Sequence, residues 1–235
     1  MKNNKYTFNK VKYKHEKRLK PGEDIKYLTG TEEDIDTIAK KYETIHKIKP
    51  AYGCKPRFEH WGKLQQILYN KKIEINSVLD IGTGAGTFTK WAHQNISKNV
   101  YASDIANSIK QEYIDLGVNF IKAPSHEIPL PDKSIDLITS FDFLEHVHPD
   151  YLEKTILETK RICRGYIFHK IAQHPSGILH LLEDEKIQKQ HNLPENVHGQ
   201  LHLIQEHRTF WEEQVFLPEF PETTFVGGGC YFLEI

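Results

Sequence analysis

The segment Val78–Thr89 constrains the fold of this chain more than any other feature of its sequence. An apolar run ends at Asp80, and glycines follow at alternate positions, Gly82, Gly84 and Gly86, before an amphipathic stretch. This order predicts a buried strand, a tight turn and the first turn of a helix. Glycines in such a turn let the backbone approach a ligand closely, because no Cβ intervenes and positive φ costs little. A nucleotide-like ligand therefore fits beyond the carboxyl end of this strand.

Apolar runs of strand length alternate with amphipathic runs of helix length from residue 76 onward. Such alternation predicts a largely parallel sheet covered by helices on both faces. Two short apolar segments at the C-terminus predict a hairpin. We therefore expect an α/β, Rossmann-like, doubly wound sheet of seven strands, mostly parallel with an antiparallel strand at the C-terminus. The expected strands are 77–81, 100–104, 118–122, 135–141, 165–171, 224–226 and 230–235, and the expected helices among them are 86–95, 107–116, 150–162 and 209–215.

Two helices are expected before the first strand, at 31–47 and 57–70, because apolar residues recur there at helical spacing. Together they are typical of a lid or cap that precedes the core domain. The expected division of the chain is a basic arm with a helical cap at 1–72, and an α/β domain at 73–235. The α/β domain carries a histidine-rich insertion at about 172–206.

The composition of the 235 residues, 38% hydrophobic and 27% charged, is ordinary for a globular protein without a membrane span. Three widely spaced cysteines favour reduced thiols and a cytoplasmic location. The first twenty residues hold eight basic residues and one acid. Such an arm can bind RNA phosphates, although a solvated tail is the simpler interpretation.

A second acid, Asp104, ends the second expected strand and follows Gly86 by about 20 residues. An acid at this separation is placed to accept hydrogen bonds from a ribose diol. A dinucleotide fingerprint has glycines in the pattern G-x-G-x-x-G, whereas this chain has G-x-G-x-G with Asp80 just before it. An acid there would repel a pyrophosphate but suits a cationic amino-acid group.

These motifs resemble those of the class I S-adenosylmethionine-dependent methyltransferases, with a type 11-like methyltransferase domain. The resemblance covers about 76–171 in the expected order and spacing. It rests on Asp80-Ile81-Gly82-Thr83-Gly84-Ala85-Gly86, on Asp104, on Ile128-Pro129-Leu130-Pro131-Asp132 and on Phe141-Asp142-Phe143-Leu144-Glu145-His146.

The resemblance implies that S-adenosyl-L-methionine is the cofactor. It implies that Asp80 lies near the methionine end, that Asp104 holds the ribose hydroxyls and that Ile105 flanks the adenine. Many members carry an acid that contacts the adenine amino group four residues before the proline-rich stretch, where this chain has Pro124. The neighbouring Ser125 and His126 become the candidates for that contact. The expected cofactor-binding residues are Asp80, Gly82, Thr83, Gly84, Gly86, Asp104, Ile105, Ser125, His126 and Phe141.

Methyl transfer from a sulfonium is an in-line displacement, and a hydroxyl acceptor also needs a base to remove its proton. His146 is the first candidate for that base, with Glu145 as its catalytic partner, because both leave the fourth strand at the edge of the glycine turn. The alternative is that this pair caps and packs the loop. Within the insertion, the segment from His202 to Trp211 is similar to a family segment that faces the acceptor. The expected substrate-binding residues are Asp142, His202 and Arg208.

Asp142, Glu145 and His146 are also similar to a divalent metal set of the ubiquinone-pathway O-methyltransferases. Three residues are weak support, so no metal ligand is expected. The predicted function is methyl transfer to a small-molecule acceptor, with a hydroxyl of a sugar or related metabolite as the acceptor group. The alternatives are an RNA-modifying methyltransferase that uses the basic arm, and a non-catalytic cofactor-binding protein.

Overall fold

The computed structural model describes residues 35–50, 52, 56–172, 180–193, 202, 204, 206 and 208–235. The basic arm lies outside the described residues, so the alternative that it binds RNA is not tested by the structure. Among the described residues, no helix combines the length and the apolar character needed to cross a membrane.

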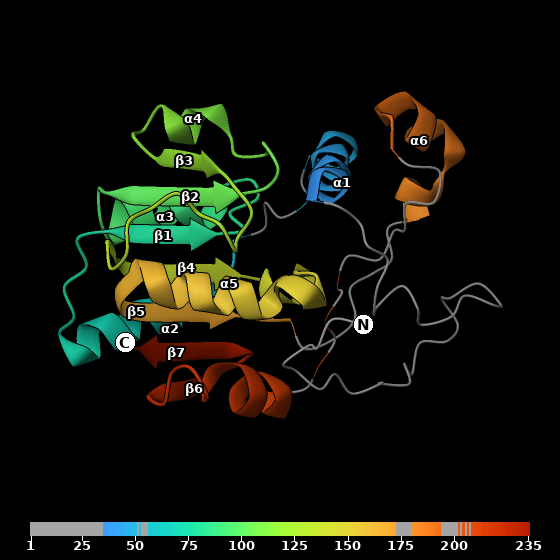
Figure 1. Ribbon diagram of the computed structural model, residues 1–235. Helices are drawn as coiled ribbons and strands as arrows, with labels where there is room; N and C mark the ends of the chain where they lie inside the picture. The colour runs from blue at the N-terminus through green and yellow to red at the C-terminus, as the bar shows by residue number, and fades with distance from the viewer. Residues whose placement is uncertain are drawn as a thin grey trace.

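A seven-stranded sheet in the order β3-β2-β1-β4-β5-β7-β6 forms the centre of the molecule (Figure 1). Strand β7 pairs antiparallel with both β5 and β6, while the pairs among β1 to β5 are parallel. The predicted doubly wound sheet with a reversed strand near the C-terminus is confirmed. The strands are β1 (Val78–Ile81), β2 (Val100–Asp104), β3 (Asn119–Lys122), β4 (Ile135–Phe141), β5 (Cys163–Lys170), β6 (Thr223–Gly227) and β7 (Cys230–Glu234).

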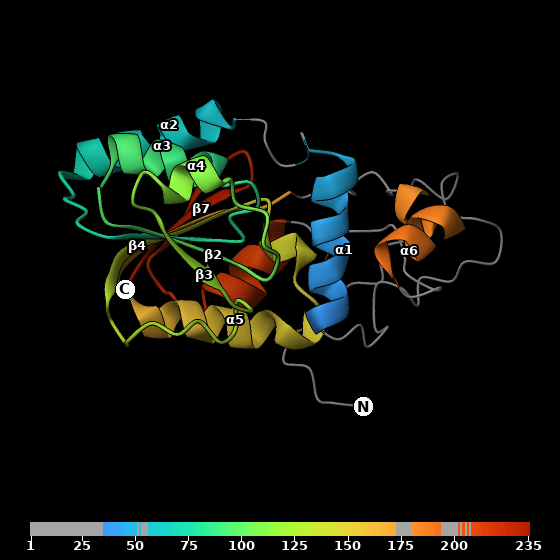
Figure 2. The same ribbon diagram turned by 90° about the horizontal axis from the view of Figure 1, so that it is seen from above.

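Helices cover both faces of the sheet because successive strand residues point to opposite sides. Val78 packs with Trp61 and Phe88 in one buried cluster, whereas the next residue, Leu79, belongs to the cluster of Trp211 on the other face. Figure 2 shows the two layers. The first face carries α2 (Phe58–Lys71), α3 (Thr87–Asn95) and α4 (Gln111–Ile114), and the second carries α5 (Pro149–Ile162) and the π-helix η5 (Phe210–Phe216).

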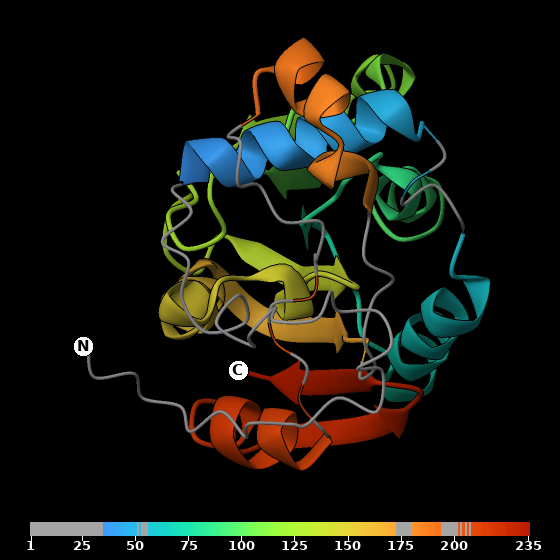
Figure 3. The same ribbon diagram turned by 90° about the vertical axis from the view of Figure 1, so that its right-hand side faces the viewer.

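Helix α1 (Ile35–Ile48) covers neither face and lies across the carboxyl ends of the parallel strands (Figures 1 and 3). Its Ile45 packs against Leu182 and Leu193, which belong to a short segment that contains η4 (His180–Glu183) and α6 (Glu185–His191). The first helix is therefore positioned over the sheet edge where the glycine turn emerges.

Two local expectations differ from the structure. The helix expected at 107–116 is reduced to α4, because the residues before it are bonded elsewhere: Ser108 donates to the carbonyl of Gly84 in the glycine turn, and the N–H of Ala106 donates to Asp104 at the end of β2. The helix expected at 150–162 begins one residue earlier, at Pro149. Its cap is His148, whose Nδ1 accepts from the N–H of Asp150, and proline occupies the first helical position.

The turn between β6 and β7 generates a test of the sheet edge. Gly229 has φ +75°, and a Cβ there would lie 2.3 Å from the carbonyl oxygen of Ile171. Gly229→Ala should lower the free energy of unfolding by about 2–5 kcal/mol, because backbone strain and overpacking add. Gly117→Ala is the control, since Gly117 has φ +96° with nothing within 4 Å of a Cβ. Urea denaturation that gave both variants equal losses would contradict the packing of this turn.

Candidate active site

The glycine turn is held to the end of β2 by backbone hydrogen bonds. The N–H of Gly82 donates to the carbonyl of Ser103 at 2.8 Å, and the N–H of Gly84 donates to Oδ2 of Asp104 at 2.8 Å. Gly82 requires glycine, because a Cβ there would lie 2.1 Å from the Phe143 ring. At Gly84 a Cβ would meet nothing nearer than 3.9 Å, so the backbone is accessible from the open side of the turn.

Asp80 lies beneath the turn with 3% of its surface exposed. Its carboxylate accepts hydrogen bonds from the hydroxyls of Thr89, at 2.8 Å, and Thr139, at 3.1 Å. Burial raises the pKa of Asp80 to about 7, against the opposing effect of the threonine hydroxyls. A cation brought close to this carboxylate would therefore favour its charged form.

Asp104 uses both carboxylate oxygens to order the turn. Oδ2 accepts from Gly84, and Oδ1 accepts from the N–H of Ala106 at 2.9 Å. Burial raises the pKa of Asp104, and these backbone donors oppose the rise. Because a carboxylate has about four acceptor sites, it can still accept from a diol.

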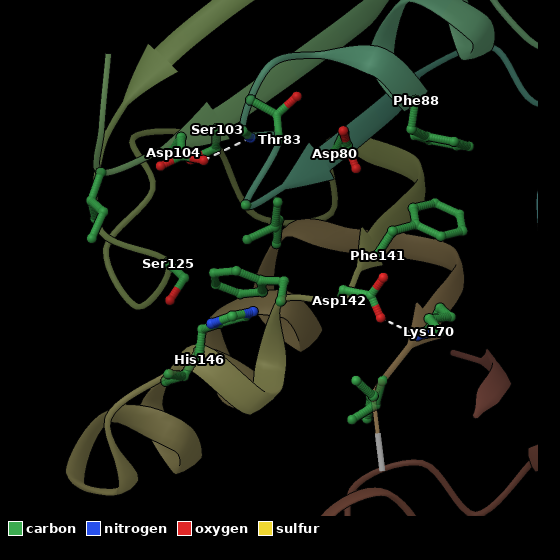
Figure 4. A pocket seen from close by; sticks show the side chains of 18 of the residues that line it. Asp80, Thr83, Phe88, Ser103, Asp104, Ser125, Phe141, Asp142, His146 and Lys170 are labelled. Atoms are coloured by element: carbon green, nitrogen blue, oxygen red, sulfur yellow. Dashed lines mark hydrogen bonds and ion pairs between the residues drawn. The ribbon is translucent and has the colours of Figure 1, made fainter. Parts of the chain in front are cut away.

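An ion-pair network follows β4. Asp142, whose φ is +52°, pairs with Lys170 at the end of β5 and with Arg57, 3.1 Å away, just before α2. Figure 4 shows Asp142 and Lys170 facing each other beside Phe141, with Asp80 and Asp104 across the hollow and Ser125 and His146 on another side. The Asp142 carboxylate is thus committed to two cations.

Glu145 and His146 lie in the 3₁₀ helix η3 (Leu144–His146). Glu145 is fully buried, and its Oε1 accepts from the N–H of Ala172 at 2.9 Å. Burial and the charge of Asp142 raise the pKa of Glu145 to about 8. The Nδ1 of His146 is 2.9 Å from the hydroxyl of Tyr42 on α1.

A cavity of about 1000 Å³ joins these groups at the carboxyl edge of the sheet. Its wall includes the glycine turn, the ends of β2, β4 and β5, and side chains of the two N-terminal helices. Of the residues predicted from the sequence, it is lined by Asp80, Gly82, Thr83, Gly84, Asp104, Ile105, Ser125, His126, Phe141, Asp142, His146 and His202.

Three predicted residues are not part of the cavity wall. Gly86 lies behind the turn, where a Cβ would meet Ile109 and Tyr113 at 2.8 Å. Glu145 is buried beneath the wall. Arg208 pairs with Glu212 and is half exposed, with its guanidinium 3.9 Å from the ring centroid of Phe225.

The structure adds wall residues that the sequence reasoning did not name. For two of them the sequence held a weak indication of a place in the cavity wall. Tyr42 fits the apolar spacing of its helix although it carries a hydroxyl, and Lys170 is a charged residue at the end of an apolar strand. The added residues with polar groups include Tyr42, His46, Tyr52, Arg57, His60, Tyr151 and Lys170.

The histidine-rich insertion is dispersed. His169 belongs to β5, where burial lowers its pKa to about 3, and its Nδ1 lies 2.8 Å from the hydroxyl of Ser140. His202 reaches the cavity and packs edge-on against His146, with ring centroids 4.5 Å apart. His174, His198 and His207 lie outside the described residues.

The buried Asp80 generates a pH test. Its folded pKa of about 7 exceeds the ordinary value of 3.8, so its contribution to stability is fully present below about pH 4 and is lost as the pH rises to about 7. Asp80→Asn should reduce the loss of unfolding free energy between about pH 5 and about pH 8. Urea denaturation at both pH values measures this, with the exposed Asp115→Asn as control. An unchanged loss in Asp80→Asn would contradict the assignment.

Comparison with known proteins identifies the domain. A family model described as "Methyltransferase domain" matches residues 79–166. A search of curated proteins gave no significant match.

Several solved structures share the fold. The complex titled DhpI-SAM-HEP is 15% identical, with 88% of this chain and 99% of that chain covered and a TM-score of 0.58. A protein from Pyrococcus horikoshii OT3 is 16% identical, with 80% and 96% covered and a TM-score of 0.52. A putative O-methyltransferase from Nostoc punctiforme PCC 73102 is 15% identical, with 74% and 55% covered and a TM-score of 0.50.

The matched part of the chain spans about half the length of some of these structures. It covers 55% of the Nostoc protein, 44% of a putative methyltransferase from Anabaena variabilis ATCC 29413 and 53% of a methyltransferase from Archaeoglobus fulgidus. At these identities the likeness concerns the fold. The sheet order agrees with the fold of these structures, and residues 79–166 match the methyltransferase-domain model, in line with what the sequence motifs predicted.

Proposed function

We propose that this protein transfers a methyl group from S-adenosylmethionine to a hydroxyl of a small-molecule acceptor, a sugar or related metabolite. The observation that carries the proposal is one continuous cavity, which joins the glycine turn and its two acids to an acceptor side built by α1, α2 and the loop after β4. Its volume of about 1000 Å³ suits a cofactor and a small acceptor together.

The donor half of the cavity has acids where a cationic nucleoside needs them. The free acceptor sites of Asp104 suit the ribose hydroxyls, and the open backbone at Gly84 suits the close approach of the ligand. Asp80 supplies negative charge for the methionine end. Ser125 and His126 are the proposed adenine contacts, and His126 is stacked on Tyr151 with ring centroids 4.4 Å apart.

The acceptor half offers a base. The contact between His146 Nδ1 and the Tyr42 hydroxyl fixes the imidazole ring, and His146 lines the cavity. In the proposed reaction, an oxygen lone pair of the acceptor attacks the methyl carbon, and the carbon–sulfur bonding pair returns to sulfur. The hydroxyl proton passes to His146. Near-attack positioning and the exclusion of water supply the rest of the acceleration.

Charge on the acceptor side favours a polar acceptor. Arg57 and Lys170 share the single carboxylate of Asp142, and all three side chains line the cavity. One positive charge in this network therefore remains uncompensated by Asp142. Such a wall suits a hydroxylated acceptor that also carries a carboxylate or phosphate.

Titration with S-adenosylhomocysteine tests the donor half. Calorimetry should show binding to the wild-type chain, and Asp104→Asn should weaken it at least about tenfold, because a charged hydrogen-bond acceptor for the ribose is lost. Asp115→Asn is the matched control and should bind as the wild type does. The absence of binding to the wild-type chain would contradict the donor assignment.

Replacement of His146 tests the base. With a panel of sugars and sugar phosphates as acceptors, conversion of S-adenosylmethionine to S-adenosylhomocysteine should fall about 100- to 10,000-fold in His146→Gln. Affinity for S-adenosylhomocysteine should not change. His93→Gln, on α3, is the control. Full turnover in His146→Gln would remove His146 from the reaction.

A further inference from the structure

Three residues on the acceptor side form a cluster with the composition of a metal site. Glu145, His146 and His202 each offer one ligand atom, and these atoms all lie within 4.8 Å of one another. Among the described residues, Asp142 is held instead by Lys170 and Arg57. The structure therefore groups His202, and not Asp142, with the Glu145-His146 pair.

Among the described residues, one carboxylate oxygen of Glu145 has no hydrogen-bond partner. The residue has 0% of its surface exposed, and its Oε1 is taken by the N–H of Ala172. Its Oε2 is buried without a hydrogen bond among the described residues. A buried acceptor left unsatisfied costs free energy and calls for an explanation, such as a bound water or ion. A cation at Oε2 would remove this cost.

The two histidines are held in place beside that oxygen. The Nδ1 of His146 lies 2.9 Å from the Tyr42 hydroxyl, and a hydrogen bond of this kind, made by one ring nitrogen, is typical of metal-binding histidines. His202 is brought to the site because the N–H of Ile204 donates to the carbonyl of Glu145 at 3.0 Å. The two rings stand edge to face, and both residues line the cavity.

We propose that Glu145, His146 and His202 bind one divalent transition-metal ion, of the type of Zn²⁺. Two imidazole nitrogens and one carboxylate oxygen suit such an ion, and three protein ligands leave a coordination position open. That position faces the cavity, since His146 and His202 form part of its wall.

The role of the ion, unlike its binding, rests on the proposed function. An acceptor hydroxyl at the open position would have a lower pKa and lose its proton to water before its oxygen attacks the methyl carbon. With the ion bound, His146 is a ligand and not the base. A test of metal binding therefore shows whether His146 acts as the general base or as a metal ligand.

Titration of the chelator-treated full-length chain with Co²⁺ tests the site, with visible absorption and calorimetry as readouts. The wild-type chain should bind one equivalent with a low-symmetry cobalt spectrum. Glu145→Gln, which keeps the side-chain shape, and His202→Ala should each weaken binding at least about tenfold and lose that spectrum. His93→Ala and His191→Ala are matched controls for the other histidines and should behave as the wild type does.

Absence of Co²⁺ binding, or an equal affinity and spectrum in Glu145→Gln and His202→Ala, would overturn the proposal. S-adenosylhomocysteine titration of the same variants distinguishes loss of the metal site from loss of the fold. Variants that still bind this ligand are folded, so a loss of cobalt binding then belongs to the site. A wild-type chain that binds S-adenosylhomocysteine but not cobalt would refute the metal site and leave the donor half of the proposed function standing.

Discussion

The hydrogen bond from the Gly84 N–H to the Asp104 carboxylate is the contact on which the cavity depends. It joins the turn after β1 to the end of β2, and the same carboxylate also orders the start of the following loop through Ala106. Both the turn and this carboxylate line the cavity. Asp104 therefore does more than cap a local turn, because it joins the segment after β1 to the segment after β2.

The second constraint is the burial of carboxylates at the cavity edge. Asp80 and Glu145 are both buried, and burial raises the pKa of each, to about 7 and about 8. A buried carboxylate with a raised pKa lowers the free energy of unfolding at neutral pH, because its charged form is disfavoured in the folded state. A cationic ligand that binds beside the carboxylate offsets this loss. The proposed partners are the methionine end of the cofactor at Asp80 and a metal ion at Glu145.

Much of the fold was predictable because its signals are local. The apolar runs that became β2 and β4 have the expected bounds, and the glycine turn follows from its own residues. The helix expected at 107–116 was wrong because the Ser108 hydroxyl bonds to Gly84, in a turn 24 residues earlier, and the N–H of Ala106 bonds to the Asp104 side chain. The helix propensity of the local residues carries no information about a contact with a distant segment.

The wall residues of the proposed donor side could be named from the sequence, and those of the proposed acceptor side much less so. Asp80 and Asp104 follow from a spacing rule, whereas Tyr42 meets His146 across 104 residues. His202 joins Glu145 through a backbone bond of Ile204 that no sequence pattern announces. The α1 helix was expected as a cap, but its apolar spacing gave no sign that its tyrosine would contact a polar group.

A crystal structure with S-adenosylhomocysteine tests the central claim, that one cavity serves donor and acceptor, most directly. The account predicts the ribose hydroxyls on Asp104, the amino-acid end toward Asp80, and the sulfur facing the side of the cavity that holds His146. A ligand bound elsewhere, or one whose sulfur faces away from His146 and His202, would contradict it.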